Sequence, residues 1–305
     1  MADIRQDPLW AQYMQETGWN VSKVSGNYAY WKRLPFYGTR FRIPRFSFPN
    51  DPSLITIALE EIDALAKKHR ALFIKITPNI LLDDPYSMPI DQLLLKQGYK
   101  KDFATNTISK TSVINLRLNE KTLSKNLHLK TRQHIKRAKK NGVEVYESND
   151  IDLCYSLYTE TSRRHGFRGE SYHAIRTRYK LFQKEKRVLL LFASVRDKPV
   201  ATLLLLGDRK KHTVFSNVAG TSDTQRNMKA NHLLLWKSIL LAKKRGYHRF
   251  DFDGIEDKRF RNHKLWENAT FFKNGFGGDE LTFLGSYIKS YHPILTLFFA
   301  LVSKR

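Results

Sequence analysis

Four short stretches of this sequence carry side chains that could do chemistry, and one of them lies near the C-terminus. Residues 271–278 read FFKNGFGG, where Lys273 follows two aromatic residues and precedes a glycine-rich turn. A fixed lysine is a compact cation that can stabilise negative charge growing on an oxygen atom. Phe272 offers a flat face for stacking a nucleobase, and the glycines allow a tight turn with close access. The plainer interpretation is a strand whose lysine points outward before a turn.

The second stretch, RHGFRGESY at residues 164–172, places Arg168 and Tyr172 four residues apart. If a helix begins near Glu170, Arg168 lies just before its N-terminus. A guanidinium beside free backbone N–H groups makes a site for an anion. The alternative is a helix-capping loop with a solvated arginine.

The third stretch, KTRQHIKRAKKNG at residues 130–142, is basic and has a helical pattern. Such a surface is typical of contact with a phosphate backbone and would be salt-sensitive. Anionic lipid is the other candidate partner, and a solvated surface is the neutral alternative. At 100° per residue, four of its six basic side chains share one face, namely Arg132, Lys136, Lys139 and Lys140. The other two are Lys130 and Arg137.

The fourth stretch, FDFDGIEDKR at residues 250–259, contains four carboxylates. Paired carboxylates can bind a metal ion or act as a general base. We favour structural roles in a turn for the group, with Asp253 as the candidate base. None of the ten histidines falls in a cluster with metal-ligand spacing, so we expect no metal.

Composition sets the outer limits of the function. The chain has 305 residues, 41% of them hydrophobic, and a formal net charge of +24. Such a charge favours an acidic partner: nucleic acid, anionic lipid or a phosphorylated small molecule. We expect no signal peptide and no membrane span, and the single cysteine, Cys154, fits a reducing cytoplasm. The apolar tail at residues 292–305 is interpreted as a final helix packed on the protein, with a membrane-surface position as the alternative.

The elements that would position these stretches alternate between helical and strand patterns. From about residue 110 the order is strand, helix, strand, two helices, a three-strand meander, helix and strand. This order matches an acyltransferase of the GNAT type, and the first half shows a looser version of it. The sequence therefore predicts an α/β (α+β) protein with two similar domains.

Four segments in series resemble the Fem family, whose members use aminoacyl-tRNA to build peptidoglycan cross-bridges. They are NLRLNEKTLSKNLHLKTRQHIKRAKKNGVEV, RRHGFRGESYHAI, VAGTSDTQRNMKANHLLLWKSILLAKKRGYHRFDFDGIED and FFKNGFGG, within residues 112–282. The resemblance implies two tandem GNAT-like domains, residues 1–111 plus 284–305 and residues 112–283. RYKLFQKEKRVLLLF leaves no room for the helical hairpin of some members, so a compact form is expected.

The resemblance also implies roles for individual residues. Phe272 and Lys273 would serve the aminoacyl-tRNA end, and Arg168 and Tyr172 would hold the phosphate region of a nucleotide-linked sugar–peptide. Two positions depart from the family pattern. Its lysine after the opening Trp10 is absent, and Val218 stands where it has a tyrosine. Both departures weaken the case for a soluble nucleotide precursor and leave room for a lipid-linked or different glycan acceptor.

The sequence thus predicts a cytoplasmic aminoacyltransferase that moves an amino acid from tRNA to a stem-peptide amine. We expect no cofactor, with aminoacyl-tRNA as co-substrate, a peptidoglycan precursor as acceptor, and contact with an anionic membrane as an option. One alternative is a GNAT-type enzyme using acyl-CoA, although Met228 stands where the CoA loop needs glycine. The others are transfer to another cell-surface glycan, and a non-enzymatic protein that binds RNA or membrane.

Overall fold

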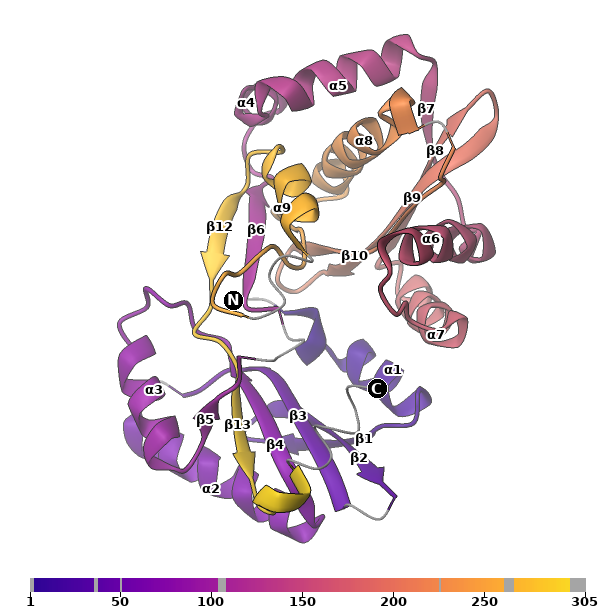
Figure 1. The fold of residues 1–305 in the computed structure, drawn as a ribbon. Coiled ribbons are helices and arrows are strands. Elements are labelled where there is room, and N and C mark those ends of the chain that lie inside the picture. The colour runs from indigo at the N-terminus through magenta and orange to yellow at the C-terminus, as the bar shows by residue number, and fades with distance from the viewer. Residues whose placement is uncertain are drawn as a thin grey trace.

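The computed structural model describes residues 3–35, 38–49, 51–103, 108–224, 226–260 and 266–296. The chain is mixed α/β and builds two β-sheets, which lie one above the other in Figure 1. This arrangement confirms the fold class expected from the sequence.

The first sheet has six strands in the order β1-β2-β3-β4-β13-β5. Its strands are β1 Asn20–Val24, β2 Asn27–Leu34, β3 Gly38–Phe46, β4 Ala71–Pro78, β13 Tyr287–Ser290 and β5 Lys100–Lys101. Around it lie η1 Ile4–Gln6, α1 Pro8–Glu16, α2 Pro52–Lys68 and α3 Ser87–Lys96. Helices α1 and α2 each begin with an aspartate cap followed by proline, which satisfies a free N–H and fixes the first φ angle. Alternation along β3 buries Phe41 and Ile43 against α2.

The second sheet has seven strands in the order β12-β6-β11-β10-β9-β8-β7. Its strands are β12 Asp279–Thr282, β6 Lys110–Asn115, β11 Arg249–Asp251, β10 Thr213–Thr221, β9 Lys198–Asp208, β8 Val188–Val195 and β7 Val143–Glu147. Its helices are α4 Glu120–Asn126, α5 Leu129–Lys140, α6 Ile151–His165, α7 Tyr172–Lys184, η2 Arg226–Met228, α8 Ala230–Lys244 and α9 Glu267–Asn274. The predicted meander is β8, β9 and β10, joined antiparallel.

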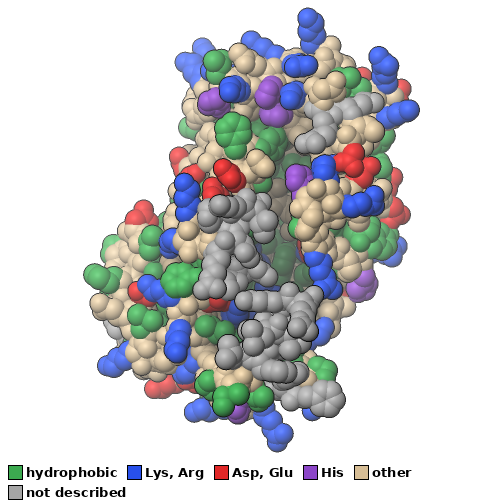
Figure 2. Space-filling view, in the orientation of Figure 1, with side chains coloured by type: hydrophobic (Ala, Val, Ile, Leu, Met, Phe, Trp, Pro, Cys, Tyr) green, Lys and Arg blue, Asp and Glu red, His purple; other side chains and the backbone are tan. Residues whose placement is uncertain are grey.

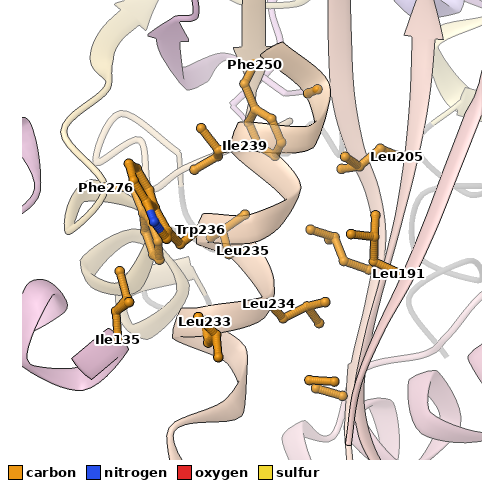
Figure 3. Close-up of a cluster of buried hydrophobic side chains, with 14 of the residues drawn as sticks. Ile135, Leu191, Leu205, Leu233, Leu234, Leu235, Trp236, Ile239, Phe250 and Phe276 are labelled. Carbon is orange, nitrogen blue, oxygen red and sulfur yellow. The ribbon is translucent and has the colours of Figure 1, made fainter. Parts of the chain in front are cut away.

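The core of this half lies between α8 and the sheet (Figure 3). Leucines run almost without interruption along β8 and β9 because both faces of these strands are covered. Helices α5 and α8 cover one face, and α6 and α7 cover the other. Phe276, from the glycine-rich stretch, is buried in the core on the α5 and α8 side of the sheet.

The N-terminal segment joins the two halves. Ile4 is fully buried in a cluster that joins side chains of α1 to those of α7, β9 and β10 in the second half. Asp3 forms an ion pair with Arg45 on β3, at 3.0 Å, while Asp7 pairs with Arg187 beside β8, at 2.5 Å. Residues 3–7 therefore hold one sheet to the other through paired charges and a buried side chain.

One local expectation needs correction. Lys273 lies in the last turn of helix α9, so the strand interpretation of its stretch is wrong. The basic stretch at residues 130–142 lies on α5, which a break at Leu127 and His128 separates from α4. Helix α7 begins at Tyr172, with the Ser171 hydroxyl capping it, two residues after Glu170. Only residues 185–187 separate α7 from β8, which agrees with the compact form.

Candidate active site

Lys273 is held by the backbone of the loop that follows β11. Its Nζ donates hydrogen bonds to the carbonyl oxygens of Phe252, at 2.9 Å, and Gly254, at 2.5 Å. An ammonium group has three N–H donors, and the described residues occupy two of them. Helix α9 therefore presents a cation whose position is fixed and whose third donor has no acceptor among the described residues.

Burial also tunes the charge of this lysine. Desolvation lowers the pKa of Lys273 to about 8, although nearby Asp253 and Asp251 act in the opposite direction. The amine is thus mostly protonated at neutral pH but loses its proton far below the usual lysine range. With a pKa this close to neutral pH, Lys273 can gain or lose its proton under physiological conditions.

Asp253 lies on the same loop, between the two carbonyl groups that bind Lys273. Its φ angle of +53° is uncommon for a residue with a side chain. The carboxylate accepts a hydrogen bond from Arg5 Nη2 at 2.6 Å, an ion pair that links the N-terminal segment to the site. Burial raises the pKa of Asp253, while Arg5 works against that increase. Burial therefore makes Asp253 a better proton acceptor than an exposed aspartate, and Arg5 limits how far its pKa is raised.

Asp251, the second carboxylate of the pair, is held by hydrogen bonds within the protein. It accepts hydrogen bonds from the Thr111 hydroxyl and from the Asp253 backbone N–H, at 2.5 and 2.8 Å. Burial, and then the neighbouring Asp253 charge, raise its pKa to about 6. Strand β11 ends at Asp251, so the two carboxylates do not lie on one strand face, as a longer strand would have placed them.

The two aromatic residues before the lysine differ in exposure, and the exposed one is not the residue that the sequence analysis selected for stacking. Phe272 is partly buried, with ring centroids 5.0 Å from His232 and 5.4 Å from Phe276. Phe271 is 75% exposed and Trp266 is 41% exposed, so these rings have free surface on α9. The helical phase of α9 turns Phe271 outward. Sequence reasoning missed Phe271 because it considered a strand and a turn for this stretch, and not a helix.

The glycines of the stretch allow other parts of the same chain to pack closely against the end of α9. A Cβ atom at Gly277 would lie 2.3 Å from the backbone oxygen of Asn126, and one at Gly275 would lie 2.4 Å from the Thr131 hydroxyl. The His128 N–H also donates to the Gly275 carbonyl at 2.9 Å. These contacts fix the end of α9 against α4 and the start of α5. The glycines therefore serve close packing between helices, where close access for RNA had been expected.

The predicted anion pair is not assembled in the structure. Arg168 is exposed in the loop before α7, and the Tyr172 hydroxyl donates to the Asp152 carboxylate on α6. The buried arginine of this region is Arg178, whose guanidinium binds both oxygens of Glu170 at 2.8 and 3.0 Å. Arg178 was missed because it lies within an ordinary amphipathic helix pattern.

The basic stretch forms the surface of α5. Thr131, Ile135 and Ala138 face the core. Lysine and arginine side chains gather at the top of Figure 2, over this helix. Five of the six predicted cations are exposed and Arg132 is partly buried; the five are Lys130, Lys136, Arg137, Lys139 and Lys140. We call these five residues the α5 basic face.

Comparison with known proteins identifies the family of this chain. The model of the FemAB family matches residues 94–198 and 192–304, which is most of the chain. The chain belongs to the FemAB family. This membership supports an acyltransferase of the peptidoglycan-bridge class, as the sequence resemblance suggested.

Solved structures agree with the FemAB assignment at the level of fold. A crystal structure of FemX superposes with a TM-score of 0.79 at 16% identity, covering 97% of this chain and 94% of that one. The C-terminal domain of a putative lysylphosphatidylglycerol synthetase from Agrobacterium fabrum gives 0.64 at 13% identity, covering 97% and 92%. A tandem GNAT protein from the clavulanic acid pathway gives 0.54 at 9% identity, covering 94% and 95%. No curated protein sequence matched the chain.

Membrane attachment through a spanning helix finds no support in the part of the chain that the structure describes. No helix there has both the length and the apolar character needed to cross a bilayer. Most of the apolar tail, residues 297–305, lies outside the described residues, so its expected packing stays a prediction.

Proposed function

We propose that this FemAB-family protein transfers an amino acid from aminoacyl-tRNA to an amine on the stem peptide of a peptidoglycan precursor. The observation that carries the proposal is the Lys273 ammonium, which two carbonyl oxygens hold in place and whose third donor no described residue occupies. In such a transfer the amine attacks the ester carbonyl, and negative charge grows on its oxygen. A pre-positioned cation stabilises that charge without having to reorganise first.

The route of the proton follows from the same loop. The attacking amine must lose a proton as the new C–N bond forms and the ribose oxygen leaves. Asp253, held by Arg5 at 2.6 Å, is the carboxylate beside Lys273 and is our candidate acceptor for that proton. Its raised pKa, caused first by burial, favours this role over that of a permanently ionised ligand.

The tRNA side of the proposal rests on how α5 and α9 are joined. The α5 basic face would track the phosphate backbone, with affinity that falls steeply as salt increases. The His128 N–H to Gly275 carbonyl bond, at 2.9 Å, ties the start of α5 to the end of α9. A tRNA bound along α5 would therefore have its acylated end directed to Lys273, with the exposed Phe271 ring available for stacking a terminal base.

Two further features bear on the choice of donor and acceptor. Met228 packs against the core at the start of α8, where an acyl-CoA enzyme of this fold needs a glycine-rich loop. This favours tRNA over CoA as the acyl carrier. Arg168 and Tyr172 stay as a proposed contact for the acceptor, although binding would have to bring them together.

The test is transfer of a radiolabelled amino acid from a pool of charged tRNA to nucleotide-linked or lipid-linked precursor. Lys273→Met removes the cation and should lower the rate at least 100-fold, the cost of losing one oxyanion donor. Lys237→Met, at an exposed position on α8, is the matched control and should retain activity. Equal activity of the two variants would refute the role of Lys273. No transfer by wild type, with acyl-CoA accepted instead, would refute the choice of donor.

A further inference from the structure

The first sheet carries a group of cations that the proposed reaction centre does not use. Arg40 and Arg42 lie two residues apart on β3, on the face opposite the buried Phe41. Lys32 on β2 lies directly across from Arg40, and Lys75 on β4 lies beside Arg42. Like charges at neighbouring positions of a sheet destabilise the fold. Four cations on one sheet face therefore do not stabilise the fold, which suggests that they bind an anionic ligand.

Only one of these four cations has an acidic partner within the described residues. Lys75 forms an ion pair with Asp102 at 2.7 Å. No described Asp or Glu forms an ion pair with Lys32, Arg40 or Arg42. The Nε of Arg40 is buried and lacks a hydrogen-bond partner in the described structure. A buried donor left unbonded is costly, and an incoming acceptor would remove that cost.

The pKa shifts agree with this picture of unmatched charge. Burial lowers the pKa of Arg40. Arg42 is exposed at the surface, yet desolvation by the surrounding protein also lowers its pKa, and repulsion from Arg40 and then Arg5 adds to the effect. Glu170 neutralises the buried Arg178, whereas no carboxylate of the described residues stabilises the charge of Arg40 or Arg42.

The cations are also held in place. The Trp19 ring lies 4.7 Å from the Arg40 guanidinium and 5.7 Å from that of Arg42, so one indole supports both. Gly18, with φ +81°, sets the turn before Trp19, and a Cβ there would lie 3.6 Å from Lys32 Nζ. Arg42 is exposed and the other two cations are partly exposed, so a ligand can reach all three.

We propose that Lys32, Arg40 and Arg42 form a binding site for a phosphate or diphosphate group. Two planar guanidinium forks match the tetrahedral oxygens of phosphate, and the lysine adds a compact charge. The site approaches the reaction centre through Arg5, which repels Arg42 and pairs with Asp253. That the bound group belongs to the acyl acceptor rests on the proposed function, whereas binding itself does not. The source is either a soluble nucleotide diphosphate or the diphosphate headgroup of a lipid.

The experiment uses the whole protein and inorganic pyrophosphate, titrated by calorimetry at low salt. The test variant is Arg40→Gln/Arg42→Gln. The control is Lys210→Gln/Lys211→Gln, which removes the same two charges from the exposed β9–β10 turn. We expect affinity to fall about tenfold or more in the test variant and to change little in the control. Arg40→Lys/Arg42→Lys keeps the charge without the forks and should bind with intermediate affinity.

Thermal unfolding gives a second readout that separates binding from misfolding. Pyrophosphate should raise the Tm of wild type and of the control variant, but not that of Arg40→Gln/Arg42→Gln. Without ligand, the test variant should be at least as stable as wild type because like-charge repulsion is relieved. An unliganded Tm clearly below that of wild type would contradict this argument.

The source of the phosphate is resolved by two further arms. Uridine diphosphate is titrated in solution, and phosphatidylcholine vesicles with and without a polyprenyl diphosphate are sedimented with the protein. The arm whose binding depends on Arg40 and Arg42 identifies the ligand. No pyrophosphate binding at millimolar concentration, or equal losses in the test and control variants, would overturn the site. Neither result would affect the Lys273→Met comparison, which tests the proposed transfer separately.

Discussion

The pH dependence of transfer is the most direct consequence of the Lys273 environment. With its pKa lowered to about 8, Lys273 is mostly an ammonium at pH 7 and mostly neutral at pH 9. If the cation stabilises the oxyanion, kcat/KM should fall by about tenfold per pH unit above pH 8. The sign follows from the role, since deprotonation removes the charge that stabilises the transition state.

Lys273→Arg provides the matched perturbation. An arginine stays protonated throughout this range, so the fall above pH 8 should disappear, although the absolute rate drops because the two carbonyl contacts are altered. Asp253→Asn should move the fall to lower pH by about one unit, because Asp253 normally supports the Lys273 charge. The assay is initial-rate transfer between pH 6 and 10, with spontaneous hydrolysis of the aminoacyl ester measured in parallel.

One pattern of results would refute this reasoning. If wild-type activity rises through pH 8 beyond the titration of the acceptor amine, and Lys273→Arg is inactive at every pH, the neutral amine is the working form. Lys273 would then act as the base, and Asp253 would lose its proposed role. A wild-type profile that is flat to pH 10 would show instead that Lys273 makes no contribution in the rate-limiting step.

Three further outcomes follow from the same contacts. Arg5→Met leaves the Asp253 carboxylate unpaired, and with side chains 13% and 19% exposed the loss should be about 2 kcal/mol in urea unfolding. Adding Asp253→Asn should recover at least about 1 kcal/mol, as a double-mutant cycle would show. Gly277→Ala should destabilise by about 2 kcal/mol or more, because its Cβ would meet the Asn126 backbone; wild-type stability would contradict the packing argument. Phe271→Ala should weaken tRNA binding with unchanged Tm, and an unchanged Kd would remove its stacking role.

The fold could be predicted from the sequence wherever a helix or strand had a clear pattern of hydrophobic and polar residues of its own. The meander from β8 to β10 was visible because leucine runs and two polar turns define it locally. Two short strands were missed: β5, at the edge of its sheet, has two residues, and β13, between β4 and β5, has four. The partners of β13 lie far along the chain, so no local pattern reveals the pairing. Helix α9 was missed because glycines at its end suggested a turn. Those glycines reflect close contact with Asn126 and Thr131, which no local pattern reveals.

In the candidate site, too, residue types could be predicted from the sequence, whereas contacts between distant residues could not. Lys273 and Asp253 could be selected from residue type and family resemblance, but their relation to each other depends on a loop folding back on α9. Arg5 could not be predicted at all, because it lies 248 residues from its partner Asp253. The choice between Phe271 and Phe272 required the helical phase, which the sequence interpretation lacked.

The charge balance of the reaction centre is therefore set by contact between the two halves of the molecule. Lys273 and Asp253 belong to the second half, whereas Arg5 lies on a segment that also pairs with Arg45 of the first sheet through Asp3. Arg5 pairs with Asp253 across this contact, and the Asp253 charge in turn favours the protonated form of Lys273. The N-terminal segment therefore takes part in setting the charge around Lys273.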